Sequence, residues 1–565
     1  MLFAKVRTKI KRKIINNVKT QKGFENSKET FPEKVSLAAG GTGGGRLKFI
    51  GRKVIYSSET EISGETIPKI INGAMLRHEQ NRREIEYLEK YFTGDQPILN
   101  RIKQIRADVN NRIVINNAYS IVRNVNGYFL GEPIKYASKD AECRDEVETL
   151  NNMMDGIDKA CGDTQIGEWQ SICGTAYRLI CVDDNSFCED KETAPFEIPV
   201  LNPKSTAVIY STQACHKPIL AFTYSDILDV NGNATGRSYT VYDKYFQYVY
   251  KTKGRRVAAD NSHSQNPETF SYLPAFGDYS NFVDIKPTDL VSGYPKPHLL
   301  GEIPIIEYPN NQWRLGDFET VLTILDGLNK LQSDRINSVE QLVNSILVFV
   351  NCELKDASEN ADGKSDLEKL KEQLAISITS KQNQQADIKF VNSQVNQDEA
   401  ETLAQTLIDY VYAVTGIPDR KTRSNGGGDT GDAVYLRDGW ASLEVVARTK
   451  ERYFRKSEKQ MLKIICKILK VFRNMEIKPM HIEPTFVRNR TNNLLNKAQA
   501  MAILKELQFI DPIDIVTLGG ISDNPIDLVK RGLEYYQRDA GATSRTETEK
   551  NSDFEHARTK TSELE

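Results

Sequence analysis

Hydrophobic residues recur at helical spacing in three long stretches of the C-terminal half of the chain. One apolar stripe predicts a helix over residues 317–345, about 40 Å long at 1.5 Å per residue. The stripe consists of Phe318, Val321, Leu322, Leu325, Leu328, Ile336, Val339 and Leu342. A second helix is predicted to begin after Asn396, which forms a capping box with Glu399, and to end at Gly416. A third helix, over residues 433–472, could reach about 60 Å.

Residues 346–395, between the first two predicted helices, have a mixed pattern. Short apolar runs at 347–350, 376–378 and 388–391 predict strands. A short charged helix is predicted over 365–375, and its charged side chains include Asp366, Glu368, Lys369, Lys371 and Glu372. This stretch therefore predicts a compact α/β insert that is joined to both helices.

Residues 417–432, between the second and third predicted helices, contain no apolar side chain after Pro418. Such a loop cannot bury itself, so it must stay mobile or contact something polar and anionic. Its candidate functional residues are three cations, an asparagine and three glycines: Arg420, Lys421, Arg423, Asn425, Gly426, Gly427 and Gly428. The acids Asp419, Asp429 and Asp432 offset the cations, and the glycines give the backbone freedom to move.

The N-terminal half combines helical and strand patterns. Structure is expected to begin near residue 67, with helices over 79–92, 113–128 and 141–169, the first of them stopped by the turn that begins at Gly94. Residues 176–250 contain short alternating apolar runs separated by turn residues, which predicts an antiparallel β region. Taken together, these patterns predict an α+β chain that is mainly helical.

The chain has 565 residues, enough for several cores, and its 75 basic and 77 acidic residues nearly balance. Global charge therefore favours no partner, and contact with nucleic acid would have to come from local patches. Residues 1–21 carry seven cations and no acid, which suits either an arm that touches DNA or an acidic partner, or a solvated terminus. The excess of basic residues over 433–472 is consistent with a solvated helix face.

Several segments lack a core-forming pattern. Residues 1–66 are predicted to be a basic arm followed by a flexible linker, because the glycine-rich run at 38–45 has no neighbouring strand, helix or Lys–Ser/Thr end to bind phosphate. Residues 255–292 are polar and predict an exposed insertion. Residues 539–565 predict a disordered tail.

The sequence argues against several functional classes. No apolar run approaches the roughly 18 residues of a membrane span, so no membrane contact is expected. The eight cysteines form no CxxC pair, so neither a metal nor a cofactor is expected. The motifs GxxxxGK[ST], GxSxG and HExxH are absent from the sequence. A structural or binding role is therefore favoured over catalysis.

Six sequence runs, read in order, carry a family resemblance. They are YFTGDQPIL at 91–99, NNRIVIN at 110–116, GYFLGEPI at 127–134, IPIIEYPNN at 303–311, and GDFE with LDGLNKLQSD within 316–334. These runs resemble portal proteins of tailed double-stranded DNA phages of the SPP1-like type. The resemblance covers roughly residues 70–536, and leaves out the basic arm, the glycine-rich linker and the insertion at 255–292.

The resemblance implies the phage portal fold, which has a wing with a β region, two stem helices, an α/β clip, a tunnel loop and a helical crown. The implied parts are the wing at 67–316, stem helices at 317–345 and 396–416, the clip at 346–395, the tunnel loop at 417–432, the long wing helix and a strand at 433–492, and the crown at 493–538.

The resemblance also implies a function. About twelve subunits would form a ring around a channel at one capsid vertex. Viral double-stranded DNA would be packaged through it by the terminase large subunit and later ejected. Further implied partners are the major capsid protein, scaffolding proteins and a head–tail adaptor. The implied locations are the virion and, during assembly, the host cytoplasm. The loop cations would line the channel, and the clip charges would contact the terminase or the neck.

Two other functions stay open at this point. A neck, tail or scaffold component would be structural too, but would need no insert between two stem helices. A DNA-packaging ATPase or a nuclease would be an enzyme, and the missing phosphate loop argues against the ATPase.

Overall fold

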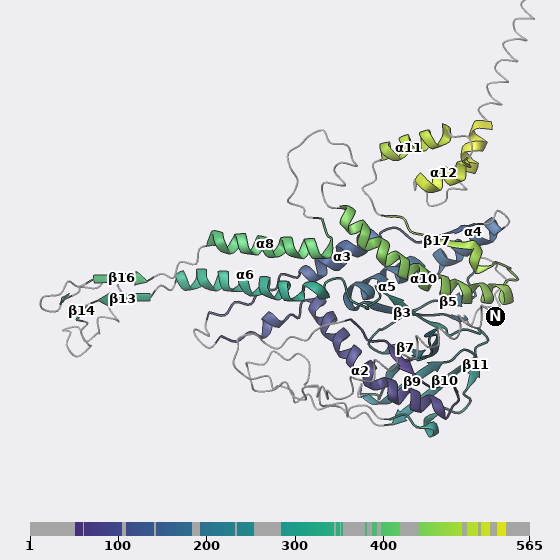
Figure 1. The fold of residues 1–565 in the computed structure, drawn as a ribbon, viewed down its shortest axis with the longest axis horizontal. Helices are drawn as coiled ribbons and strands as arrows, with labels where there is room; N and C mark the ends of the chain where they lie inside the picture. Colours follow the sequence, from purple (N-terminus) through teal and green to yellow (C-terminus); the bar gives the residue numbers. More distant parts are fainter. Residues whose placement is uncertain are drawn as a thin grey trace, which may run out of the picture. The chain divides into compact units, whose positions relative to one another are not determined.

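The computed structural model describes residues 51–59, 61–103, 109–139, 143–182, 193–231, 234–253, 284–343, 346–350, 352–353, 379–380, 387–391, 397–418, 440–488, 494–506, 510–519 and 528–537. The chain divides into two compact units, and all of these residues lie in the larger one, which comprises residues 49–265 and 271–565. Helices and strands are interspersed in this unit, so the predicted α+β class is confirmed (Figure 1). No helix among the described residues is long and apolar enough to cross a membrane.

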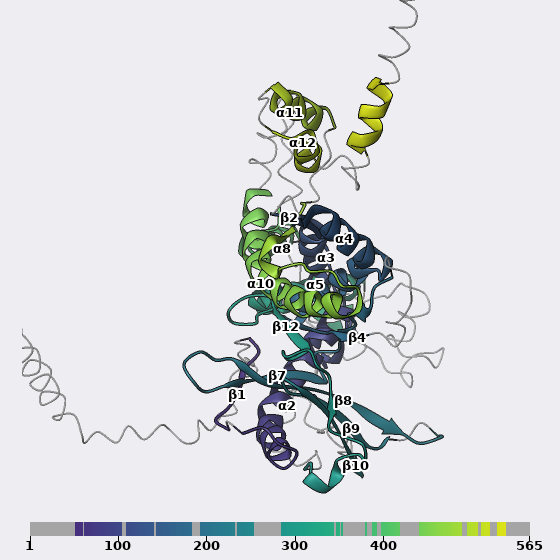
Figure 2. The same cartoon turned by 90° about the vertical axis from the view of Figure 1, so that its right-hand side faces the viewer.

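A six-stranded sheet has the order β1–β7–β8–β9–β10–β11 (Figure 2). Its strands are β1 (Ile55–Ser57), β7 (Thr206–Ser211), β8 (Pro218–Leu228), β9 (Ala234–Tyr242), β10 (Phe246–Lys253) and β11 (Lys296–Pro297). Strand β1 runs parallel to β7, and the other pairs are antiparallel. Residues 55–57, which the sequence pattern assigns to a flexible linker, thus supply an edge strand, because Ile55 packs into the core beneath the sheet.

Helix α2 (Thr66–Thr93) covers one face of this sheet (Figures 1 and 2). It is longer than the predicted helix over 79–92 because its first half is apolar on the side that meets the strands. That side presents Ile67, Ile70, Ile71, Ala74 and Met75 to Phe222, Tyr239, Val241 and Tyr250. The helix ends at Gly94, as predicted, where φ is 101° in the left-handed region that favours glycine. Ile285 joins the same core, so the predicted exposed insertion at 255–292 has a folded end.

A second core is built around the three-stranded sheet β12–β3–β6, formed by Ile305–Pro309, Thr175–Leu179 and Val200–Leu201. Around it lie α3 (Asn117–Phe129), α4 (Arg144–Gly156), α5 (Lys159–Cys173), the β2–β17 pair (Lys135–Ser138, Ile482–Thr485) and the β4–β5 pair (Cys181–Val182, Phe196–Glu197). The single helix predicted over 141–169 is wrong. It is two helices, because Asp158 has φ 50° and interrupts the helical backbone.

Helices α6 (Leu322–Val343) and α8 (Gln397–Thr415) lie side by side, with the antiparallel strands β13 (Ile346–Val350) and β16 (Asp387–Val391) between them in the chain (Figure 1). Strands β14 (Cys352–Glu353) and β15 (Thr379–Ser380) form a second short pair. Helix α6 begins at Leu322, after the 3-10 turn η5 (Glu319–Val321), and not at residue 317. The start is delayed because the side chains of Asp317 and Glu319 are held by distant cations, described below.

Helix α10 (Trp440–Phe472) is the longest described helix. Its apolar face contributes to the second core through Phe454, Met461, Leu462, Ile465, Ile468 and Leu469. Helices α11 (Leu494–Glu506) and α12 (Pro512–Gly519) pack on each other, and residues 528–537 are also helical. Short 3-10 turns occur at η2 (Pro97–Asn100), η4 (Pro287–Asp289) and η7 (Pro479–His481).

Candidate functional site

Three buried polar side chains on one face of α6 hold an extended segment of the chain. Asn329, Ser333 and Asn337 are spaced four residues apart and are at most 1% exposed. They accept hydrogen bonds from alternate backbone N–H groups: Ile115 to Asn329 Oδ1 at 2.8 Å, Ile113 to Ser333 Oγ at 2.9 Å and Asn111 to Asn337 Oδ1 at 2.6 Å. This polar ladder gives residues 111–115 partners that a strand would otherwise supply. For this reason α3 starts at residue 117 and not at 113 as predicted, with Asn116 as its N-cap.

Helices α6 and α8 also contact each other through polar groups, while they leave apolar side chains exposed. Arg335 of α6 donates to Gln397 Oε1 at 3.2 Å and to Glu401 Oε2 at 2.6 Å, both on the first turns of α8. Five apolar side chains on the two helices are at least 46% exposed: Ile336, Val339, Leu403, Tyr410 and Val414. Leu403, Tyr410 and Val414 lie on one face of α8, since they are seven and four residues apart. The pair therefore has apolar surface that nothing in the described chain covers.

The end of α8 and the beginning of α10 lie against each other. Gly416 ends α8 as predicted, with φ 73°, and its N–H donates to Tyr412 O at 2.9 Å. A Cβ atom at Gly416 would lie 3.2 Å from Val446 Cγ2 and 3.4 Å from Ser442 O, both in the first turns of α10. The end of α8 is therefore packed against the beginning of α10.

Lys450 fixes the first half of α10 to the chain that precedes α6. Its side chain is 3% exposed, and Nζ donates to Asp317 Oδ2 at 2.7 Å and to Ser171 Oγ at 2.8 Å. The backbone N–H of Asp317 also donates to Ser171 O at 2.7 Å. One lysine thus connects α10, α5 and the entry to α6.

Glu458 fixes the middle of α10 through a buried charge cluster. The cluster contains two cations and two carboxylates, Lys159, Arg178, Asp163 and Glu458, each with a side chain at most 4% exposed. Glu458 lies 3.2 Å from Lys159 Nζ and 3.5 Å from Arg178 Nη1, and it accepts hydrogen bonds from Tyr136 at 2.6 Å and Tyr308 at 2.9 Å. Burial and the nearby Glu458 raise the pKa of both tyrosines, so their hydroxyls stay protonated as donors.

A second buried cluster connects the segment before β1, α2 and η5. Arg52 Nη2 donates to Glu319 Oε2 at 2.9 Å, and Arg52 Nε lies 3.1 Å from Glu84 Oε2. Glu319 Oε1 accepts from Gly316 N at 2.7 Å. Burial raises the pKa of Glu319 to about 7 and also raises the pKa of Glu84, and in both cases it outweighs the nearby Arg52, which acts to lower the pKa.

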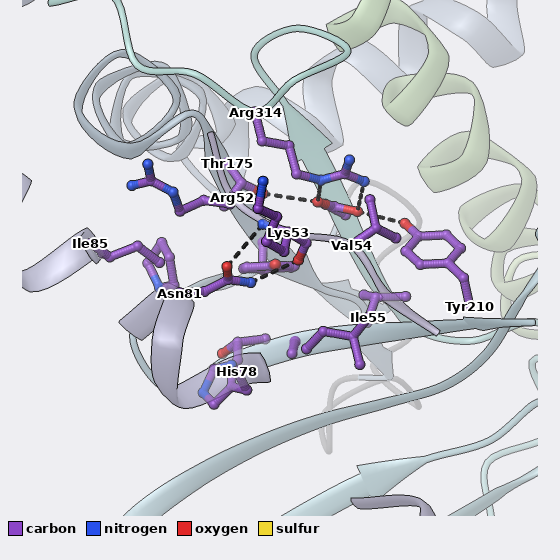
Figure 3. A pocket seen from close by; sticks show the side chains of 16 residues that line it. Arg52, Lys53, Val54, Ile55, His78, Asn81, Ile85, Thr175, Tyr210 and Arg314 are labelled. Carbon is purple, nitrogen blue, oxygen red and sulfur yellow. Dashed lines mark hydrogen bonds and ion pairs between the residues drawn. The ribbon is translucent and has the colours of Figure 1, made fainter. Parts of the chain in front are cut away.

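Beside this cluster, Glu307 is surrounded by three donors, Arg314, Tyr210 and Thr175, which are labelled in Figure 3. It accepts from Arg314 Nη2 at 2.9 Å, from Tyr210 Oη at 2.6 Å and from Thr175 Oγ1 at 3.1 Å. Burial acts to raise the pKa of Glu307, but Arg314 outweighs it and holds that pKa below its usual value. The cavity that these residues line has a volume of about 20 Å³, which is room for about one water and for no substrate. The arrangement is structural.

The residues predicted to act on DNA or on a partner lie outside the described part of the chain. These are the loop residues Arg420, Lys421, Arg423, Asn425, Gly426, Gly427 and Gly428, and the insert residues Asp366, Glu368, Lys369, Lys371 and Glu372. The structure describes the elements that flank them. For the loop these are the adjoining ends of α8 and α10, and for the insert they are β13, β14, β15 and β16.

Sequence comparison adds the family to this geometry. Residues 76–512 match the family described as phage portal protein, SPP1 Gp6-like. The chain belongs to this family of phage portal proteins. The portal protein of Bacillus phage SPP1 is 20% identical to the chain over 375 residues, which is 65% of this chain and 64% of that protein. The match thus spans a little less than two thirds of that relative. Portal proteins are structural components of the phage particle, so this chain is a structural protein and not an enzyme, as predicted.

Sequence reasoning missed the buried charges that position α10 in this portal protein. The excess of basic residues in α10 predicts a solvated face, yet the basic Lys450 is buried, and so is the acidic Glu458. A signal was present for Glu458, since Phe454, Met461 and Leu462 lie at helical spacing around it. A charge on the apolar stripe of a helix indicates a buried partner, although not which one.

Proposed function

We propose that about twelve copies of this chain form a closed ring around a channel at one vertex of the capsid. Membership of the portal family supports this, and so does the exposed apolar surface of α6 and α8. Monomeric proteins seldom expose such side chains on two adjacent helices, and a neighbouring copy in a ring would cover them. Viral double-stranded DNA would enter and later leave the capsid through this channel.

In the ring, the parts of the chain would take the following roles. Residues 67–316 would form the wing, 317–345 and 396–416 the stem helices, 346–395 the clip, 417–432 the tunnel loop, 433–492 the long wing helix and its strand, and 493–538 the crown. The observation that best supports this assignment is the packing of Gly416 against α10, because it holds together the end of α8 and the beginning of α10, the two elements on either side of the proposed loop.

The tunnel loop would touch the DNA backbone during translocation. Arg420, Lys421 and Arg423 would each approach a phosphate, and the neighbouring Asp419, Asp429 and Asp432 would keep the contact weak. Weak contact suits a channel, because tight phosphate contacts release counterions and would hold the DNA in place.

The clip would contact the terminase large subunit during packaging and the head–tail adaptor afterwards. Its charged residues Asp366, Glu368, Lys369, Lys371 and Glu372 suit a transient, electrostatically guided partner. The wing and crown would contact the major capsid protein and scaffolding proteins. Assembly would take place in the host cytoplasm.

Loop and clip variants test these roles in a packaging assay with capsids that contain the portal. Replacing Arg420, Lys421 and Arg423 together with alanine should leave the ring assembled but change the length of DNA packaged or retained. Reversing the charges of Glu368 and Glu372 should reduce packaging, again without loss of the ring. Wild-type packaging and retention by the loop variant over a range of salt would exclude the loop from DNA contact.

A further inference from the structure

The exposed face of α10 is a row of cations. The exposed residues between positions 448 and 470 are seven cations together with Thr449 and Gln460. The cations, here called the cationic stripe, are Arg448, Arg452, Lys456, Lys459, Lys463, Lys467 and Lys470. They recur every three or four residues, so they lie along one side of the helix over about 33 Å.

The acids of the same helix neutralise this face only at Arg448, whose Nε lies 2.9 Å from Glu444 Oε1. Glu458 is buried in the charge cluster, and Glu451 is half-buried and bound by Arg455 and Arg488. The C-terminal half of the stripe has acidic partners from other segments: Lys459 pairs with Glu483 at 3.2 Å, Lys463 with Glu302 at 2.5 Å and Lys470 with Glu476 at 2.5 Å.

The uncompensated charge therefore lies in the N-terminal half of the stripe. Within the described part of the chain, Arg452 and Lys456 have no ion-pair partner. Both side chains are exposed and adjacent along the face.

A surface hollow of about 460 Å³ reaches the first of these two cations, Arg452. It is lined by four arginines, two glutamates and one aromatic ring: Arg448, Arg452, Arg455, Arg488, Glu444, Glu451 and Phe486. The side chain of Arg488 is 8% exposed, and its Nε and Nη2 bind Glu444 and Glu451. Its Nη1 is buried and has no hydrogen-bond partner among the described atoms, and the same is true of Arg455 Nε. With four arginines against two glutamates, the lining of the hollow carries a surplus of positive charge.

The chemistry of this surface indicates its partner. Interfaces between proteins need an apolar core and are depleted in lysine, whereas the exposed residues of α10 from 448 to 470 include no apolar side chain. Surfaces that bind nucleic acid are polar and strongly basic, and arginine forks match phosphate oxygens. We propose that the N-terminal half of the cationic stripe and the adjoining arginine hollow bind the phosphate backbone of duplex DNA without sequence preference. The proposal rests on the proposed function in that a portal protein handles DNA, but it concerns a surface outside the tunnel loop.

Equilibrium binding to a duplex tests this surface. The full-length protein is titrated into a fluorescent 30-base-pair duplex, and binding is measured by anisotropy over a range of salt. Arg452→Ala/Lys456→Ala should weaken binding about tenfold near 0.1 M salt and reduce the slope of log K against log salt by about 2, because two phosphate contacts are lost. Neither side chain has an ion-pair partner among the described residues, so the variant should fold normally. Lys251→Ala/Lys253→Ala is the matched control, since it removes the same charge from exposed positions on β10 and should not alter the slope.

Each outcome of this experiment decides the proposal. If the stripe variant binds the duplex as the control does, with the same slope, the proposal is wrong. It is also wrong if poly-glutamate binds with the predicted dependence on Arg452 and Lys456 while the duplex does not, because the surface would then recognise an acidic protein. The same titration with the loop variant of Arg420, Lys421 and Arg423 separates channel contacts from stripe contacts. If the protein forms rings but the Arg452/Lys456 variant binds DNA as the wild type does, only this inference is wrong. If the variant weakens DNA binding but the protein forms no rings, only the proposed ring is wrong.

Discussion

Glu458 of α10 and Arg178 of β3 lie 3.5 Å apart, and both side chains are fully buried. They are 280 residues apart in the chain, and they are joined in the same cluster by Lys159 and Asp163. A pair of buried charges does not by itself make a fold more stable than apolar packing would. It does make the position of α10 specific, because a shift of one helical turn would leave charges buried and unpaired. The helix that follows the proposed tunnel loop therefore has a defined position relative to β3 and α5.

Removing one charge of this cluster should be costly. Glu458→Gln leaves two buried cations with one carboxylate, so the free energy of unfolding should fall by about 3–5 kcal/mol. Chemical denaturation measures this. The adjacent Lys459→Ala, at an exposed position of α10, should change it by no more than about 0.5 kcal/mol. Equal stabilities of the two variants would contradict the role given to Glu458.

The polar ladder on α6 predicts a local effect on residues 111–115. Asn329→Ala removes the acceptor of Ile115 N–H and the donor to Gln96, so stability should fall by about 1–3 kcal/mol. Hydrogen exchange at the amide of Ile115 should also become faster. Lys330→Ala, the exposed neighbour, should leave both quantities unchanged. Unchanged exchange at Ile115 in the Asn329 variant would show that the ladder does not hold this segment.

Two glycines should respond to alanine in opposite directions. Gly416 has φ 73° and little room for a Cβ atom, so Gly416→Ala should destabilise the protein by about 1–2 kcal/mol. Gly327 lies within α6 with open space around it, so Gly327→Ala should stabilise the protein by up to about 1 kcal/mol. Thermal unfolding measures both changes. Stabilisation by Gly416→Ala would contradict the tight packing between α8 and α10.

Glu319 predicts a dependence of stability on pH. Its pKa is about 7 in the folded protein, above its ordinary value of 4.5, so the folded state holds this proton more tightly than the unfolded state. This group therefore reduces stability progressively as pH rises from about 4.5 to about 7. Glu319→Gln removes the titration. The stability of the variant relative to the wild type should rise by about 3 kcal/mol between pH 4.5 and pH 8. A difference that does not change with pH would contradict the raised pKa.

Local signals in the sequence were sufficient to predict a helix end where a single residue determines the backbone conformation. Gly94 and Gly416 end their helices as predicted, since both adopt positive φ. The strands predicted at 347–350 and 388–391 pair as β13 and β16. The break at Asp158 was missed because a non-glycine residue with positive φ has no distinctive local pattern. Strand β1 was missed because three residues become a strand only when β7 is present to pair with them.

The candidate site could be predicted only in part. The periodicity of apolar residues shows which face of a helix is apolar, and it predicted the existence of both α6 and α8. It cannot show which distant group neutralises a buried charge, so the pairing of Lys450 with Asp317 was not predictable. The roles of the loop residues 420–428 and of the insert residues 366–372 stay predictions.

Electron microscopy of the purified full-length protein tests the central claim most directly. We predict that negatively stained particles are closed rings with a central hole, and that their class averages show rotational symmetry of about twelve. The matched variant Leu403→Glu/Tyr410→Glu, which places charges on the exposed apolar face of α8, should give fewer rings and more small particles. Wild-type particles that are only compact monomers, in the presence and absence of scaffolding protein and over a range of salt, would contradict the account.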